Sequence, residues 1–279
     1  MINDENPEKM PILKFEKQGD EINEALVFIH GWPDDQSLWD KEFERFSKSY
    51  CCVRTTLPNC GEQLDRRWGV DFPELVELIS QTITQALPNH QKIIIVGHDW
   101  GAYLAYHFEH IYPERVKKMI TMDVGGHFKT SSYGHALMMM SYQWWLVAAW
   151  LIGMLLPFIG NWMTRALSQY ARAPRGTDVH CRMNYFYFYL WRAIFFPKKY
   201  RSSLLGCYQP RCPILYFYGK NKPYQFHSIK WEKLLAESQD SEVVAVPHAG
   251  HWLMRDQHET VAAKMEQWLG RDYLPAEGR

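Results

Sequence analysis

The sequence predicts an α/β protein built on a mostly parallel sheet, with helices on both faces and an inserted helical cap. Short apolar runs alternate with helical patterns along most of the 279 residues, which is typical of a parallel sheet covered by helices. The alternation is interrupted once, at about 125–209, by an aromatic segment without a strand pattern. That segment is too long for a simple loop. We therefore expect a core domain of residues 1–124 and 210–279, with a helical cap of residues 125–209.

Six segments are predicted to be strands because each is a short run of apolar, mostly β-branched or aromatic residues. They are Ala25–Ile29, Tyr50–Thr56, Lys92–Val96, Met119–Val124, Ile214–Tyr218 and Val243–Val246. Five segments have the apolar spacing of helices. They are Leu38–Ser47, Phe72–Leu87, Ala102–Tyr112, Ile229–Glu237 and His258–Leu269. Residues 1–10 and 274–279 are expected to be loose termini. The active site is expected at the carboxyl ends of the strands, where such sheets bind ligands.

Charge and cysteine content limit the classes of function. Lys and Arg together number 31, as do Asp and Glu, so no nucleic acid and no strongly charged partner is expected. The six cysteines lack the paired spacing of metal sites, and Cys51 and Cys52 fall in a predicted buried strand. No secretory signal pattern opens the sequence. A reducing, cytoplasmic location is therefore predicted.

The cap segment is strongly apolar. Residues 130–164 contain no Asp, Glu, Lys or Arg, and Trp144–Gly160 is almost wholly apolar. The latter is near the lower length limit of a membrane span, but Pro157 and the flanking glycines argue against one. We predict a buried or substrate-lining helical cap, and peripheral contact of the cap with a membrane is the alternative. An aromatic, uncharged cap favours a lipophilic small-molecule substrate.

The most informative motif is the pentapeptide GHDWG at 97–101, which follows an Ile-Ile-Ile-Val run. A β-branched strand that ends in Gly-x-nucleophile-x-Gly is the sequence form of a nucleophile elbow, a sharp turn that raises the middle side chain above the sheet. The middle residue is Asp99. A carboxylate is suited to displacing a leaving group at saturated carbon, which forms an ester that water later cleaves. Epoxides or alkyl halides are therefore the expected substrates. A helix N-cap is the alternative role for this aspartate.

Three motifs in this order resemble the α/β-hydrolase superfamily. They are HGWP at 30–33, GHDWG at 97–101 and GHW at 250–252. Together with the helical insertion they are most similar to the branch of epoxide hydrolases and haloalkane dehalogenases, over about residues 25–270. The resemblance implies the α/β-hydrolase fold, a cis Trp32-Pro33 peptide bond, and catalysis without a metal or an organic cofactor.

The resemblance implies a base and an oxyanion hole. His251 is the expected base that activates water against the ester, because imidazole accepts a proton near neutral pH. His248, three residues earlier, is the competing histidine, and the sequence around His251 favours the latter. The oxyanion-hole donors are expected to be the backbone N–H groups of Trp32 and Trp100. Core packing would also account for these two tryptophans.

The third member of the expected triad departs from the usual pattern. The family's acid commonly follows the strand predicted at 214–218, but Lys222 occupies that position, and an ammonium group cannot orient an imidazolium. In some dehalogenase relatives the acid instead follows the strand after the nucleophile helix. Asp123 stands at the end of that strand, so we predict that it pairs with His251. A role in capping the first turn of the cap is the alternative for Asp123.

Cap tyrosines are expected to distinguish epoxide opening from halide release. Epoxide opening needs an acid at the departing alkoxide, a task suited to phenol hydroxyls. Epoxide hydrolases of this branch hold the epoxide oxygen with two cap tyrosines, and Tyr142 resembles the first in its context. The second is expected at Phe186, whose neighbours Tyr185 and Tyr187 are both candidates. Halide departure instead needs weak N–H donors, commonly indoles.

The sequence thus predicts an epoxide hydrolase-like enzyme in which Asp99 attacks the epoxide and His251, paired with Asp123, hydrolyses the ester to a diol. A haloalkane dehalogenase with the same three residues is one alternative. It would use the indole of Trp100 and a second one from Trp144 or Trp145. A catalytically idle hydrolase scaffold that binds lipid or membrane through its cap is the other alternative, which the lysine at position 222 would explain.

Overall fold

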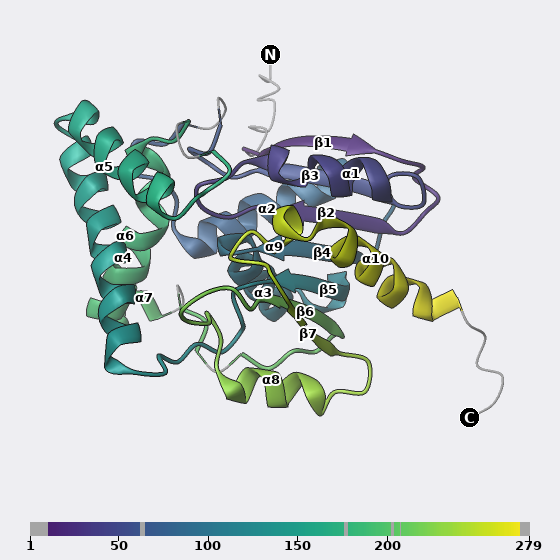
Figure 1. The fold of residues 1–279 in the computed structure, drawn as a ribbon. Coiled ribbons are helices and arrows are strands. Elements are labelled where there is room, and N and C mark those ends of the chain that lie inside the picture. The colour runs from purple at the N-terminus through teal and green to yellow at the C-terminus, as the bar shows by residue number, and fades with distance from the viewer. Residues whose placement is uncertain (1–10, 62–64, 176–177, 202–203, 207, 274–279) are drawn as a thin grey trace, which may run out of the picture.

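The computed structural model describes residues 11–273 except 62–64, 176–177, 202–203 and 207. The predicted loose termini lie outside the described residues. Figure 1 shows a sheet covered by helices, with a second group of helices standing against one end of the strands.

A seven-stranded sheet forms the centre of the core, in the order β1-β3-β2-β4-β5-β6-β7. The strands are β1 (Lys14–Gln18), β2 (Ala25–Ile29), β3 (Cys51–Thr56), β4 (Ile93–His98), β5 (Val116–Met122), β6 (Ile214–Gly219) and β7 (Glu242–Val246). β1 pairs antiparallel with β3, and every other pair is parallel. β2 and β4 are buried along their whole length, as expected where helices cover both faces of a parallel sheet. The predicted mostly parallel sheet is confirmed.

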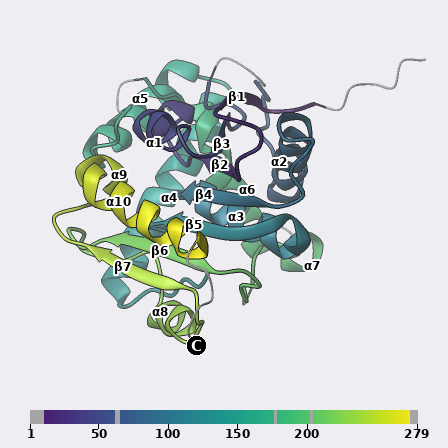
Figure 2. The same cartoon turned by 90° about the vertical axis from the view of Figure 1, so that its right-hand side faces the viewer.

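Helices cover the two faces of the sheet (Figure 2). α2 (Phe72–Ala86), α3 (Trp100–Ile111) and α8 (Ile229–Ala236) pack on one face, and α1 (Asp40–Phe46), α9 (Leu253–Asp256) and α10 (His258–Leu269) on the other. The side chains of β2 alternate between the faces: Val27 joins the first core cluster, and Leu26 and Phe28 join the second. This period of two is the pleat of a strand buried on both sides.

Between β5 and β6 the chain leaves the sheet and forms the cap. The cap helices are α4 (Tyr133–Gly153), α5 (Pro157–Tyr170), α6 (Tyr185–Phe195) and α7 (Pro197–Tyr200). They stand at the carboxyl ends of the strands (Figure 1), and the described residues between β5 and β6 contain no strand. The cap therefore faces the edge of the sheet at which the active site is expected.

Differences from the sequence prediction have simple physical reasons. β1 is not predicted because it is a polar, partly exposed edge strand and lacks an apolar run. β5 ends at Met122, so Asp123 follows the strand. The prediction of a buried or substrate-lining cap segment holds for one face of α4 only: Trp150 is buried, whereas Leu137 and Leu151 are exposed. Composition alone does not distinguish the two faces of a helix that is apolar all round.

The turn between β4 and α3 brings backbones into very close contact. A Cβ atom on Gly101 would lie 2.1 Å from the carbonyl oxygen of Ile29, and one on Gly97 would lie 2.6 Å from the carbonyl oxygen of Gly101. Real Cβ atoms do not approach backbone so closely. The two glycines of the motif therefore allow α3 to begin directly against β2, which fixes the position of Asp99 between them.

We predict that Gly101→Ala lowers the free energy of unfolding by about 2–3 kcal/mol, since backbone must move to admit the methyl group. Gly270→Ala is the matched control, because no atom lies within 4 Å of the added Cβ; its effect should stay within about 0.5 kcal/mol. Urea unfolding followed by circular dichroism measures both. Equal stability of the two variants would contradict the packing described here.

Candidate active site

Asp99 occupies the apex of the turn between β4 and α3. Its backbone has φ 54° and ψ −120°, a conformation that non-glycine residues rarely adopt and that is concentrated at functional sites. The backbone N–H of Trp32 donates to Asp99 Oδ2 at 2.8 Å, and the N–H of Trp100 also stabilises this carboxylate. A Cβ on Gly31 would lie 2.5 Å from Oδ2, so glycine is needed for this approach. The two expected oxyanion donors thus converge on Asp99.

The structure brings Asp99, His251 and Asp123 together. His251 Nε2 lies 3.8 Å from Asp99 Oδ1, and His251 Nδ1 lies 2.5 Å from Asp123 Oδ2. The contact of His251 Nδ1 with Asp123 Oδ2 is a short charge-assisted hydrogen bond. It orients the imidazole ring so that Nε2 points toward Asp99. Asp123 also has a positive φ, 70°. The competing His248 lies exposed in the turn after β7. The expected cis Trp32-Pro33 bond is present.

Lys222 binds the other oxygen of Asp123. Its Nζ lies 2.5 Å from Asp123 Oδ1, and the side chains of Lys222 and Asp123 are 8% and 0% exposed. The backbone N–H of Gly219 donates to the same oxygen at 3.3 Å. Sequence reasoning treats this lysine only as a missing acid. Because β5 and β6 are parallel neighbours, the residues that follow these strands meet at one edge of the sheet. The order of the strands is therefore the signal from which the contact of Asp123 with Lys222 could have been predicted.

Burial and neighbouring charges set the titration of this cluster. Burial raises the pKa of Asp99, against the stabilising effect of His251 and the two backbone N–H groups. Burial alone would raise the pKa of Asp123, but Lys222 and His251 hold it well below its usual range. Burial opposes protonation of His251, yet Asp123 and Asp99 raise its pKa, while Lys222 lowers it. Asp123 is therefore an ionised partner, and His251 is the group that titrates.

Two cap tyrosines lie beside Asp99. Tyr142 comes from α4 and Tyr187 from α6, and their ring centroids are 6.0 Å apart with the planes nearly perpendicular. Burial raises the pKa of both phenols, and the charge of Asp99 raises each further. The Tyr187 ring also packs edge-on against Trp32 and Trp100, which flank Asp99. Both phenols are thus neutral and near enough to Asp99 for its charge to raise their pKa.

Tyr185, the other candidate for the second tyrosine, lies away from Asp99. Its ring stacks on Phe186 at 4.1 Å, and the Cα of Gly69 lies against it, since an added Cβ would be 2.3 Å from the Tyr185 Cβ. Its ionisable neighbours are Cys60 and Tyr189. Its buried hydroxyl has no hydrogen-bond partner among the described residues. Of the two alternatives for the second tyrosine, the structure thus favours Tyr187, because α6 turns Tyr187 toward Asp99 and Tyr185 into the core.

The indoles near Asp99 are differently occupied. Trp100 stacks between Phe72 and Phe186, at 5.5 and 5.4 Å, and its buried N–H has no hydrogen-bond partner in the described part of the chain. The indole of Trp32 donates to Asn184 Oδ1 at 2.9 Å. The Trp100 N–H nevertheless acts on the Tyr187 hydroxyl, since it lowers the pKa of that phenol, whereas the indole of Trp32 is bound to Asn184.

The two cap tryptophans proposed as halide donors lie on the outer side of α4. The Trp144 ring packs on Trp191 and Phe195, and the Trp145 indole donates to the carbonyl oxygen of Met163 at 2.9 Å. They are 38% and 40% exposed. Neither is positioned to provide a second indole N–H at Asp99.

Sequence reasoning missed two buried groups beside His251. Asp34 accepts a hydrogen bond from the indole of Trp252 at 2.8 Å, and burial raises its pKa to about 7. The ring of His98 lies 4.6 Å from that of His251, and its Nε2 bonds the His251 carbonyl oxygen at 3.0 Å. Burial lowers the pKa of His98. Both groups hold the loop that carries His251. Asp34 directly follows the HGWP motif and His98 lies inside GHDWG, and these positions are the available sequence signal.

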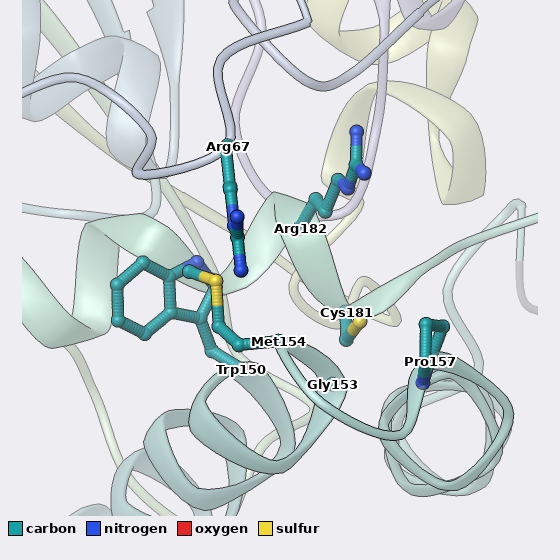
Figure 3. Close-up of a pocket in the computed structure, with 7 residues that line it drawn as sticks. All are labelled: Arg67, Trp150, Gly153, Met154, Pro157, Cys181 and Arg182. Carbon is teal, nitrogen blue, oxygen red and sulfur yellow. The ribbon is translucent and has the colours of Figure 1, made fainter.

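A separate cavity of about 210 Å³ lies where α4 passes into α5 (Figure 3). It is lined by Arg67, Trp150, Gly153, Met154, Pro157, Cys181 and Arg182. None of Asp99, His251 and Asp123 lines it, so it is distinct from the site built on these residues.

Comparisons with known proteins identify the family and the fold. A model of the "Alpha/beta hydrolase family" matches residues 26–264. "Epoxide hydrolase 3" of Xenopus tropicalis is 22% identical over 280 residues, which cover 92% of this chain and 74% of the relative. "Epoxide hydrolase 1" of Caenorhabditis elegans is 30% identical over 115 residues, 40% of this chain and 28% of that relative's length.

A solved structure has the same fold. It is the epoxide hydrolase of Bacillus megaterium in complex with an inhibitor, with a TM-score of 0.70 and 19% sequence identity. The match covers 93% of this chain and 97% of the other. At this identity the likeness concerns the fold, and the reaction must be argued from the site.

We predict that Lys222→Gln shifts the acid limb of the pH–rate profile for ester hydrolysis to higher pH. The Lys222 ammonium lowers the pKa of His251, so its removal raises that pKa, and a higher pH is needed to obtain the neutral base. Single-turnover rates measured between pH 5 and 9 give the profile.

The matched control is Lys220→Gln, an exposed lysine in the same turn, which should leave the profile unchanged. Circular dichroism checks that both variants are folded. An unchanged profile in folded Lys222→Gln, or the same shift in both variants, would contradict the role given to the Lys222–Asp123 pair.

Proposed function

The chain belongs to the alpha/beta hydrolase family, and we propose that it opens lipophilic epoxides to diols through an ester formed on Asp99. The observation that carries this proposal is the pair of phenols near Asp99, the partly buried Tyr142 and the buried Tyr187. A departing epoxide oxygen needs a proton donor on the side opposite the attacking carboxylate. Two neutral hydroxyls at such a position suit this task.

The first step forms the ester. Asp99 Oδ1 attacks one epoxide carbon, the carbon–oxygen bond of the ring breaks, and the oxygen takes a proton from Tyr142 or Tyr187. The backbone N–H of Trp32 keeps the other carboxylate oxygen, Oδ2, in place, and the N–H of Trp100 also stabilises the carboxylate. Relief of ring strain helps this attack, so the protein's contribution is alignment and the stabilisation of negative charge on the epoxide oxygen.

The second step cleaves the ester. A water between His251 and the ester gives a proton to His251 Nε2 and attacks the carboxyl carbon of Asp99. The same two backbone N–H groups stabilise the resulting oxyanion. The intermediate then collapses, the alcohol oxygen takes the proton from His251, and the diol leaves. The remaining proton, on the hydroxyl that water added to Asp99, passes to the tyrosinate left by the first step, which restores the phenol and the Asp99 carboxylate. Asp123, at 2.5 Å from His251 Nδ1, stabilises the imidazolium that forms between these events.

The charge change on Asp99 prepares His251 for its task. The Asp99 carboxylate raises the pKa of His251 in the free enzyme. An ester at Asp99 carries no charge, so this contribution disappears and the pKa of His251 falls. The neutral base thus becomes more abundant only after the ester has formed.

The two alternatives have weaker support. A haloalkane dehalogenase would use the indole of Trp100, but Trp32 is bound to Asn184 and Trp145 to Met163, so a second indole donor is lacking among the described residues near Asp99. An idle scaffold would not need the short Asp123–His251 contact or the strained backbone of Asp99 and Asp123. The epoxide reaction uses the Asp123–His251 contact, and it uses Asp99 at the apex of its turn.

We predict that His251→Gln accumulates a covalent adduct on Asp99, because attack proceeds while ester hydrolysis loses its base. Intact-mass spectrometry after addition of styrene oxide should show a mass increase equal to the epoxide, and peptide mapping should place it on Asp99. Asp99→Asn is the control and should show no adduct. Adduct formation on another residue, or full turnover by Asp99→Asn, would refute the mechanism.

The two neighbouring tyrosines of α6 give a matched test of ring opening. Tyr187→Phe should slow ester formation by something on the order of 10²-fold, with ester hydrolysis little changed. Tyr185→Phe removes a buried, unpartnered hydroxyl and should leave both steps unchanged. Stopped-flow and quench measurements with styrene oxide separate the steps. Equal effects of the two substitutions, or halide release from 1-bromohexane faster than diol formation, would overturn the epoxide assignment.

A further inference from the structure

The outer face of α4 exposes a continuous apolar stripe. Six side chains at helical spacing form it and are 38–97% exposed: Tyr133, Leu137, Met140, Trp144, Leu151 and, just past the helix end, Leu155. Phe195 extends the stripe sideways, since its ring lies 5.7 Å from that of Trp144. Apolar patches of this extent on a protein surface mark interaction sites.

The opposite face of α4 is fixed to the protein. Leu146, Val147 and Trp150 are buried there, and Tyr142, on the same side, lies beside Asp99. By length and composition α4 is apolar enough to cross a membrane, and 33% of its most apolar window is buried inside the protein. Because its inner face packs against α5 and α6, the helix is placed to lie on a membrane rather than to span one.

The charges of the cap indicate what lies against the stripe. Residues 125–209 contain nine Lys and Arg but a single acidic residue, Asp178, whereas the whole chain has 31 of each sign. Arg175, Arg182 and Arg192 form ion pairs with carboxylates of the core. The cap is therefore strongly positive, and the core carries the compensating negative charge.

Three further cations lie next to the stripe in the sequence. Lys129 precedes α4, and Lys198 and Lys199 follow the exposed Phe195 and Phe196 after one residue, Pro197. All three lysines are exposed, and none forms an ion pair with a residue that the structure describes. Exposed aromatic and aliphatic side chains bordered by unpaired lysines are the combination that binds anionic lipid surfaces.

We propose that the apolar stripe docks the cap onto an anionic lipid bilayer. The stripe enters the headgroup region, and the three lysines contact the anionic headgroups. A second copy of this chain fits the stripe less well, because two caps of the same positive charge repel each other. This proposal does not depend on the epoxide reaction, since it concerns the face of α4 opposite the site.

Vesicle flotation tests the proposal with the full chain. The protein should float with vesicles of phosphatidylcholine containing 30% phosphatidylserine and bind those of phosphatidylcholine alone at least about tenfold more weakly. Raising the salt concentration should reduce binding to the anionic vesicles. Equal binding to both compositions at low salt, or no binding to either, would overturn the proposal.

Two pairs of variants locate the binding surface. Leu137→Asp with Leu151→Asp should reduce binding at least about tenfold, whereas Ile22→Asp with Ile229→Asp, at exposed apolar residues of the core, should not. Lys198→Glu with Lys199→Glu should reduce binding similarly, and Lys230→Glu with Lys233→Glu on α8 is the matched control. Thermal unfolding checks that each variant is folded. Equal losses in a test pair and its control would contradict the assigned surface.

Light scattering of the unliganded protein separates the bilayer from a second copy. The proposal predicts a monomer in solution whose mass is unaffected by Leu137→Asp with Leu151→Asp. A dimer that these substitutions convert to a monomer would assign the stripe to self-association instead and overturn the proposal.

Discussion

The arrangement of the site depends on one buried cluster of charges at the carboxyl edge of the sheet. Asp99 follows β4, Asp123 follows β5, Lys222 follows β6 and His251 follows β7, and these four strands are consecutive neighbours. A buried carboxylate without a partner is strongly destabilising. Lys222 and His251 each bind one oxygen of Asp123, so the acid stays ionised inside the protein. The strand order thus brings the cluster together, and the pairing makes its burial tolerable.

Lys222 adds a positive charge to this cluster that a simple carboxylate–imidazole pair lacks. Its charge offsets that of Asp123, so the acid still orients His251 but raises the pKa of the imidazole less than an uncompensated carboxylate would. Since Lys222 offsets part of the effect of Asp123, the pKa of His251 depends more strongly on Asp99, whose charge changes during the proposed reaction. On the opposite side of the site, α4 has two separate roles: its inner face brings Tyr142 to Asp99, and its outer face carries the apolar stripe.

Much of the core and part of the site could be predicted from sequence because strong local patterns encode them. The apolar strands and the GHDWG motif predict the sheet and the position of Asp99. The resemblance to dehalogenase relatives, in which the acid can follow the strand after the nucleophile helix, implies the pairing of Asp123 with His251, which the structure contains. The rotation of α6 could not be predicted, since Tyr185 and Tyr187 flank Phe186 symmetrically and only packing turns one of them to the site. The contact of Lys222 with Asp123 depends on two distant segments meeting. Which face of α4 is exposed depends on which side packs against the rest of the protein. The sequence of α4 is apolar on all sides and does not show which side this is.

In the proposed mechanism, the oxygen added to the substrate comes from Asp99 and not directly from water. A single turnover of an epoxide by excess enzyme in water enriched in oxygen-18 tests this most directly. The account predicts that the first diol contains no heavy oxygen and that the label enters the Asp99 carboxylate, because water attacks the carboxyl carbon of the ester. Heavy oxygen in the first diol, with none in Asp99, would contradict the account.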